Sequence, residues 1–340
     1  VCVLSVITST YLLKVYCWPG AAARELHHPI RLNFFFGPLI GTMFLANGTP
    51  PDISDQTADP PNQTPVGLAV PIMLLQLMGE LLVYHEWIFS ESLSIRNNNP
   101  AYQISIVGNF VGAVTLARAG LKRLGMFFWS VGILFWLLIF ISLFQTISKM
   151  AHRDKDGKRT DIWRFPSSAH PMLFLFVAAP SAAGTAWNAL NGFGNVVVFF
   201  QSIGLFISMF MLLNIRLLIK TPFSISWWAY TFPLGAISIV TTRYAESDLD
   251  DDVLKYLAFI LSLISSAAVL FVLGLTLHRL CISDWEIDSM TGAVKNPGLF
   301  GIDPVIEVCL IHNYDTKDKS GRLVHCKHVI TLPHPKRAGQ

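Results

Sequence analysis

Nine apolar stretches, each close to the length that crosses a lipid bilayer, dominate this 340-residue sequence. A membrane-spanning helix needs about 20 apolar residues, because every backbone polar group in hydrocarbon must be paired within the segment. Within the nine stretches, only Lys14 and Glu80 are charged. The sequence therefore predicts an all-α integral membrane protein. The stretches are Val1–Tyr16, Leu32–Ala46, Val66–Tyr84, Ala101–Ala117, Gly125–Ile147, His170–Leu190, Val196–Leu213, Phe223–Thr242 and Tyr256–Thr276.

Composition and motifs narrow the functional classes. Hydrophobic residues make up 52% of the chain and charged residues 14%, against about 25% charged in ordinary soluble domains. The basic residues form no cluster of the kind that binds nucleic acid, and we expect no nucleic-acid partner. The sequence contains no nucleophile–base pattern, phosphate loop or HExxH motif. The alternative of a membrane enzyme or a seven-helix-type receptor therefore rests on hydrophobicity alone. We expect no enzymatic activity and no cofactor.

The five cysteines are scattered without a CxxC pair, which argues against a disulfide framework. The tightest group of possible metal ligands is His325-Cys326-Lys327-His328, and its spacing matches no standard zinc motif. We therefore expect no metal site.

In three of the stretches, a proline follows a phenylalanine within four residues and interrupts the apolar run. Phe232-Pro233 stands in the middle of an uncharged run, where a proline removes one backbone N–H and frees the carbonyl of Ala229. A freed carbonyl in hydrocarbon must face protein or water, so we expect a kinked helix that lines a cavity. The pattern recurs as Phe36 with Pro38 and Phe176 with Pro180. In the fourth stretch Gly108 and Gly112 flank Phe110, and every second helix is therefore expected to be breakable and to belong to an inner ring.

The distribution of Lys and Arg predicts the orientation in the membrane. If the first stretch runs from outside to inside, the inner loops hold 12 Lys and Arg residues and the outer loops hold 5. This bias agrees with the positive-inside rule. Two glycosylation sequons, at Asn47 and Asn62, fall in a loop that this topology places outside, although Pro65 weakens the second.

Both ends of the chain carry expectations of their own. The sequence begins with Val inside an apolar stretch, which we interpret as a truncated transmembrane helix preceded by one further span. We expect a transmembrane domain over residues 1–280 and a polar cytosolic tail over residues 281–340. Short strands are possible in the tail at Val305–Ile311 and Val329–Leu332.

Several of these segments together resemble the plant slow-type (S-type) anion channels and the bacterial tellurite-resistance/C4-dicarboxylate transporters. They are spread in order over residues 28–233. The matching stretches are His28–Phe36, Glu80-Leu81 with Tyr84 and Trp87, Val107–Ala113, Phe176–Asn188 and Phe223–Pro233.

The resemblance implies helical hairpins in a quasi-fivefold arrangement around a central pore, with nine of ten transmembrane helices present. It also implies a homotrimer in the plasma membrane, with regulatory protein kinases as partners. A phenylalanine of the ninth helix occludes the pore in this family, and it matches Phe232. The implied function is a channel for chloride, nitrate, malate or similar anions, and the alternative is a proton-coupled C4-dicarboxylate or tellurite-resistance transporter.

The remaining site residues follow from the pore hypothesis. Pore-lining positions are expected on the inner helices, basic residues at the cytosolic mouth could recruit anions, and Glu80 is either a structural hydrogen-bond partner or a proton-coupling group. Inner spans without Lys or Arg suit conduction, because fast conduction needs weak binding. The expected lining comprises Phe36, Phe110, Phe176, Pro38, Pro180 and Pro233, and the expected mouth comprises His28, Arg31, Arg164 and Lys220.

Overall fold

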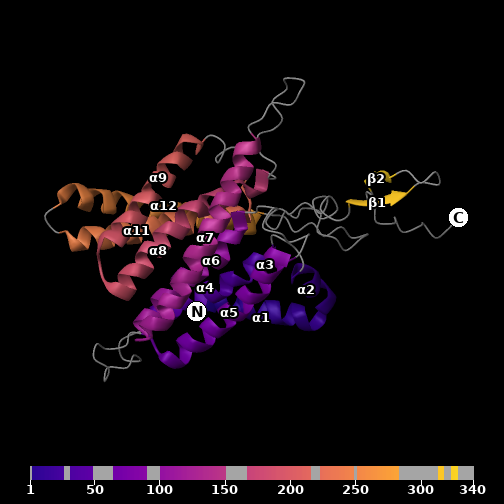
Figure 1. Ribbon diagram of the computed structural model, residues 1–340, viewed down its shortest axis with the longest axis horizontal. Helices are drawn as coiled ribbons and strands as arrows, with labels where there is room; N and C mark the ends of the chain where they lie inside the picture. The colour runs from indigo at the N-terminus through magenta and orange to yellow at the C-terminus, as the bar shows by residue number, and fades with distance from the viewer. Residues whose placement is uncertain are drawn as a thin grey trace. The chain divides into compact units, whose positions relative to one another are not determined.

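The computed structural model describes residues 2–26, 31–48, 64–89, 100–150, 167–215, 223–248, 251–282, 313–317 and 323–327 (Figure 1). The chain divides into two units, Val1–Val272 and Leu273–Gln340, so the division falls within the last long helix and before the expected boundary at residue 280. The α-helices are α1 (Cys2–Cys17), α2 (Pro19–Leu26), α3 (Arg31–Phe34), α4 (Phe36–Asn47), α5 (Val66–Phe89), α6 (Gln103–Arg118), α7 (Lys122–Met150), α8 (Leu175–Asn191), α9 (Asn195–Leu213), α11 (Thr231–Ser247) and α12 (Asp252–Ile282). Three 3₁₀-helices are η3 (Pro100–Tyr102), η4 (Ser167–Phe174) and η5 (Ile225–Tyr230).

All nine predicted spans contain a helix, which confirms the all-α membrane architecture. Five of the described helical segments are long and apolar enough to cross a bilayer: α5, most of α7, the end of η4 with α8, α9 and most of α12. Two shorter apolar helices, Leu4–Cys17 and Leu32–Asn47, cover the first two spans.

Four helices form the interior of the first unit. Helix α6 packs against α4 and α8, and α8 packs against α11, so the inner helices follow one another in chain order (Figure 1). Each inner helix is followed by a partner, as in the pairs α4–α5, α6–α7 and α8–α9. Buried residues make up 78% of the apolar window of α8 but only 11–33% in α5, α7, α9 and α12. Alternate helices are therefore inner and outer, as the sequence predicted.

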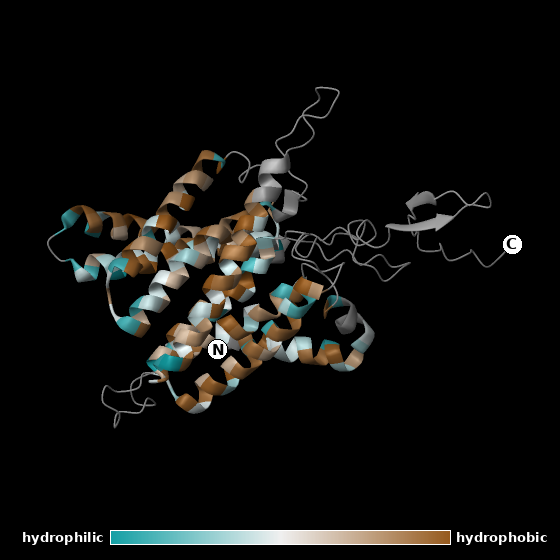
Figure 2. Ribbon diagram, in the orientation of Figure 1, coloured by the Kyte–Doolittle hydropathy of each residue, from teal (hydrophilic) through white to brown (hydrophobic). Residues whose placement is uncertain are grey.

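The outer helices present apolar side chains away from the core. Figure 2 shows α9 largely in the colours of hydrophobic residues, and Phe199, Phe206 and Met209 on this helix are exposed. Exposed apolar surface of this extent fits hydrocarbon as the surrounding medium.

The prolines sit differently from the expected mid-helix kinks. Pro38 and Pro233 each occupy the third position of an α-helix, where an N–H has no partner within the helix and its loss costs little. The residues before Pro233 form η5, and the α-helix begins only at Thr231. Pro180 alone of the three lies inside its helix. In the other two spans the break lies just before the proline: α3 ends at Phe34 ahead of α4, and η5 ends at Tyr230 ahead of α11.

The glycines of α6 serve close packing. Helix α6 runs without interruption from Gln103 to Arg118, so its two glycines do not break it. A methyl group at Gly108 would collide with the side chain of Gln76, and one at Gly112 would collide with Met73, both on α5. Small residues allow membrane helices to approach this closely.

Aromatic side chains and polar contacts help to hold the inner and outer helices together. Tyr84 and Trp87 of α5 stack with centroids 4.7 Å apart, and Trp87 stacks on Tyr102 of η3 at 4.6 Å. The indole N–H of Trp129 on α7 donates to the carbonyl of Ala183 on α8 at 3.0 Å.

Within the second unit, strands β1 (Asn313–Lys317) and β2 (Leu323–Lys327) pair antiparallel. The two strands expected at Val305–Ile311 and Val329–Leu332 lie outside the described residues.

Candidate functional site: a cavity between four helices

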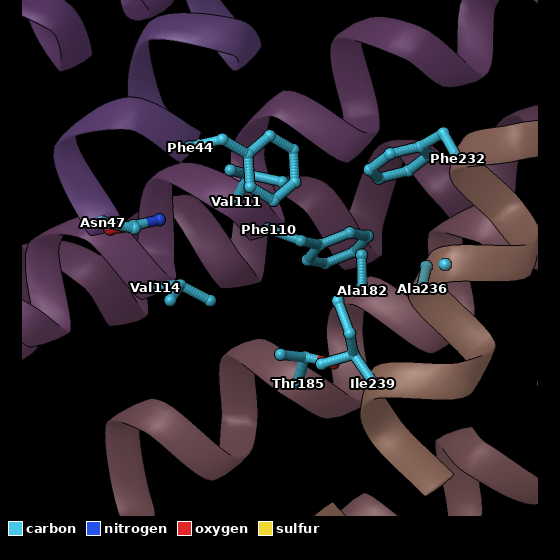
Figure 3. Close-up of a pocket in the computed structure, with 11 residues that line it drawn as sticks. Phe44, Asn47, Phe110, Val111, Val114, Ala182, Thr185, Phe232, Ala236 and Ile239 are labelled. Atoms are coloured by element: carbon cyan, nitrogen blue, oxygen red, sulfur yellow. The ribbon is translucent and has the colours of Figure 1, made fainter. Parts of the chain in front are cut away.

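A cavity of about 160 Å³ lies between the four inner helices, and each of them contributes to its wall (Figure 3). A water molecule occupies about 30 Å³ of liquid, so the cavity has room for a small ion with some of its hydration water. No lining residue is charged, and most are apolar. The lining consists of Phe44 and Asn47 from α4, Phe110, Val111 and Val114 from α6, Ala182 and Thr185 from α8, and Phe232, Gly235, Ala236 and Ile239 from α11.

Phe232 and Phe44 meet across this cavity. Phe232 is the second residue of α11 and is partly buried. The centroid of its ring lies 6.0 Å from the centroid of the Phe44 ring, at an interplanar angle of 61° (Figure 3). Edge-to-face contacts of this kind are favourable but shallow, about 0.5–1.5 kcal/mol. The pair narrows the space between α4 and α11 with two apolar rings.

Among the other residues expected to line a pore, Phe110 contributes to the cavity wall and the remaining five do not. Phe36 packs toward Gly79 of α5, and Phe176 makes edge contacts with Phe140 and Phe144 of α7. These two rings fill the space between inner and outer helices. They are absent from the wall of this cavity, as are Pro38, Pro180 and Pro233, and their place along a pore stays a prediction.

The expected basic mouth lies mostly outside the described residues. His28, Arg164 and Lys220 are not described, and of Arg31 only its position at the start of α3 is known. The helix ends themselves are informative, since α3, η3, η4 and η5, which precede the inner helices, contact one another in sequence order. The N-termini of α4, α6, α8 and α11 therefore gather at one end, where their N–H groups provide partial positive charge.

Glu80 belongs to a buried polar network between α5 and α6. Its side chain is 1% exposed, and Gln76 donates from Nε2 to Glu80 Oε1 at 2.6 Å and to the carbonyl of Ser105. Asn109 donates from Nδ2 to the hydroxyl of Tyr84 at 3.3 Å. Glu80 is absent from the cavity lining, so the network links α5 to α6 behind the wall.

The opposite end of the cavity carries polar groups that the sequence analysis did not assign to a pore. Asn47 is the last residue of α4, and its backbone carbonyl accepts a 2.7 Å hydrogen bond from Nη1 of Arg118, at the end of α6. Asn47 also heads a glycosylation sequon, yet its side chain lines the cavity and its Oδ1 is buried. This placement disfavours the expected glycan at Asn47, and Asn62 lies outside the described residues.

Sequence reasoning missed Phe44, Asn47 and Thr185 because no neighbouring proline or charge marks them. Helical spacing carries part of the signal: Phe110 and Val114 are one turn apart, as are Phe232 and Ala236. Extending the face of Phe232 by whole turns would have identified Ala236, but Phe44 requires knowledge of how α4 and α11 approach.

Comparisons with known proteins agree with this arrangement. The family model described as "Voltage-dependent anion channel" matches residues 1–277. The S-type anion channel SLAH3 of Arabidopsis thaliana is 35% identical over 301 residues, which cover 87% of this chain and 44% of that protein. The guard cell S-type anion channel SLAC1 of the same plant is 34% identical over 278 residues, covering 79% and 46% respectively.

The chain thus spans about half the length of these curated relatives. The family match covers both the inner and the outer helices of the first unit, and the cavity lies within it. The chain is an integral membrane protein that belongs to the voltage-dependent anion channel family.

Proposed function

We propose that the protein conducts small monovalent anions, such as chloride or nitrate, through the cavity between α4, α6, α8 and α11. The observation that carries this proposal is a single cavity to which all four inner helices contribute, with no charged side chain in its lining. An uncharged wall holds anions weakly, which favours conduction, and the gathered helix N-termini supply attraction at one end. The names of the curated relatives, S-type anion channels, support the same function.

We assign the gate to Phe232. A ring in an apolar constriction blocks ions sterically and also makes the space too apolar to stay wet. Phe232 is only partly buried and borders the open space of the cavity, so its ring has room to swing away from Phe44.

The test uses the full-length protein in oocytes, with surface expression measured alongside anion current. Phe232→Ala is expected to raise the basal current about tenfold, the effect of lowering a barrier by about 1.4 kcal/mol. The basal current of Phe232→Leu is expected to lie between those of Phe232→Ala and wild type, because leucine keeps bulk but loses the flat ring. Phe199→Ala is the matched control, since Phe199 is 59% exposed on α9. A Phe232→Ala protein that reaches the surface and conducts no more than wild type would contradict the gate.

A proton-coupled transporter is the alternative, and it has little support from the geometry. Its one candidate group inside a span, Glu80, lies behind the cavity wall in a hydrogen-bonded network. Under the channel proposal, Glu80→Gln conducts normally and its current follows the anion gradient alone. A current that is driven by a proton gradient in wild type and lost in Glu80→Gln would favour the transporter.

The remaining expectations are proposals about the complete protein. We propose that it forms a homotrimer in the plasma membrane and that protein kinases regulate it. The exposed apolar faces of outer helices such as α5 and α9 provide surfaces for lipid and for neighbouring subunits. Mass measurement in lipid nanodiscs tests the assembly: a monomeric or dimeric particle would contradict the trimer.

A further inference from the structure

The end of the cavity opposite the gathered helix N-termini has a different chemistry from the rest. Asn47 and Thr185 are the polar lining side chains, and the hydroxyl of Thr185 already donates to the carbonyl of Ser181 at 3.0 Å. The amide nitrogen of Asn47 is turned toward the cavity in Figure 3, and its oxygen is turned away. Among the described lining residues, the side-chain N–H groups of Asn47 are therefore the free donors that face this space.

Arg118 adds positive charge beside Asn47. A guanidinium carries five N–H donors. Among the described residues, one of these is used in the 2.7 Å bond to the Asn47 carbonyl, and no carboxylate forms a salt bridge with Arg118. The nearby Arg243 interacts with it by repulsion and is itself paired with Glu246 at 2.8 Å. Arg118 thus neutralises the negative end of helix α4 and retains unused donors.

We propose that Asn47, with Arg118 beside it, forms an anion-binding site at this end of the cavity that sets ion preference. This inference rests on the proposed channel function. Apolar walls cannot replace the hydration of a strongly hydrated or divalent anion, so the site takes a weakly hydrated monovalent anion, of which nitrate is the representative. The planar nitrate ion offers three acceptor oxygens to the carboxamide donors.

The first experiment measures the nitrate-to-chloride permeability ratio from reversal potentials of the full-length protein carrying Phe232→Ala. Asn47→Leu has similar size but no donor, and we expect it to lower the ratio about fivefold, equivalent to the roughly 1 kcal/mol of one hydrogen bond. Thr49→Ala removes the sequon but keeps the amide, and Asn214→Leu changes a partly exposed asparagine just after α9. Both controls should keep the wild-type ratio. An unchanged ratio in Asn47→Leu overturns the inference.

The contribution of Arg118 is tested by Arg118→Gln, which keeps an N–H donor for the Asn47 carbonyl but removes the charge. We expect lower current at low ionic strength and a smaller difference at high ionic strength, because salt screens the charge. Arg118→Lys should restore the current. Equal currents of wild type and Arg118→Gln at low salt would remove Arg118 from the site.

A binding measurement separates this inference from the channel proposal. Nitrate should raise the melting temperature of the purified wild-type protein, because a ligand that binds only the folded state stabilises it. Asn47→Leu should show no such shift, and gluconate should cause none in either protein. A nitrate shift without any anion current refutes the channel but retains the site; equal shifts in both proteins overturn the site. A loss of mass on deglycosylation that Thr49→Ala abolishes also overturns it, because a glycan would occupy the same nitrogen.

Discussion

Phe44 supplies the surface on which Phe232 rests, so the proposed gate is a pair of residues. We expect Phe44→Ala to raise the basal current, but less than Phe232→Ala does, because the ring of Phe232, to which we assign the gate, remains in the cavity. The double variant should conduct little more than Phe232→Ala, since residues in contact are not additive. Leu45→Ala is the control, because Leu45 is the next residue of α4, is exposed and does not line the cavity. Fully additive effects in oocyte recordings would show that the two rings act separately.

Glu80 illustrates how a buried acid can serve structure. Gln76 donates to Glu80 Oε1 at 2.6 Å, and a glutamine at position 80 offers the same acceptor. We expect Glu80→Gln to melt near wild type in detergent, and Glu80→Ala to lose about 1–3 kcal/mol, because Gln76 is left buried without this partner. Glu86→Ala, at a more exposed carboxylate of the same helix, is the control. Equal melting temperatures for Glu80→Ala and wild type would show that the hydrogen bond between Gln76 and Glu80 does not stabilise the protein.

At single positions, the sequence analysis identified residues that a neighbouring proline marks. It missed residues whose place in the cavity depends on how two helices approach each other. Phe232 stood out because a proline follows it in an uncharged stretch, and it does line the cavity. Phe36 and Phe176 carry the same mark but turn toward outer helices, because a proline does not specify which face of a helix its neighbour occupies. Asn47 was interpreted only as a sequon, since its place in the wall depends on where α4 ends.

At the scale of helices, glycines set how closely the pairs pack. A methyl group at Gly125 of α7 would lie 2.8 Å from Leu190 Cδ2 and 3.0 Å from the backbone oxygen of Ala113. The backbone cannot yield as a side chain can, so we expect Gly125→Ala to cost about 1–3 kcal/mol. Gly67→Ala, in the first turn of α5 with open space around it, should be neutral or slightly stabilising. Detergent melting curves compare the two, and equal stability would show that α7 can shift freely.

The sequence predicted that these helices exist, but it did not predict the residues at which they begin. A helix lies in each of the nine apolar stretches, because hydrocarbon permits few other structures, and five of the described helical segments are long enough to span a bilayer. The 3₁₀ segments η4 and η5, and the prolines at the third position of α4 and α11, shift the starts of these helices in ways that apolar length does not record.

For the whole molecule, the hairpin order and the Lys/Arg bias together predict which end faces the cytosol. The N-termini of the four inner helices gather at one end, so the loop from Asn47 to Pro65 and the basic loop from Lys149 to Arg164 leave the bundle at opposite ends. With 12 basic residues on one side and 5 on the other, the second loop is expected inside. The positive helix ends, and with them the attraction for anions, would then face the cytosol.

Cysteine accessibility tests this orientation in the full-length protein, in a background whose native cysteines are replaced. We expect a cysteine at Thr57 to react with an impermeant maleimide on intact cells, and one at Lys155 to react only after permeabilisation. The same reagent on permeabilised cells controls for folding, because both sites should then be labelled. Labelling of Lys155→Cys from outside would show that the orientation in the membrane is the reverse of the one expected. The gathered helix ends would then attract external anions, and the Asn47–Arg118 site would face the cytosol.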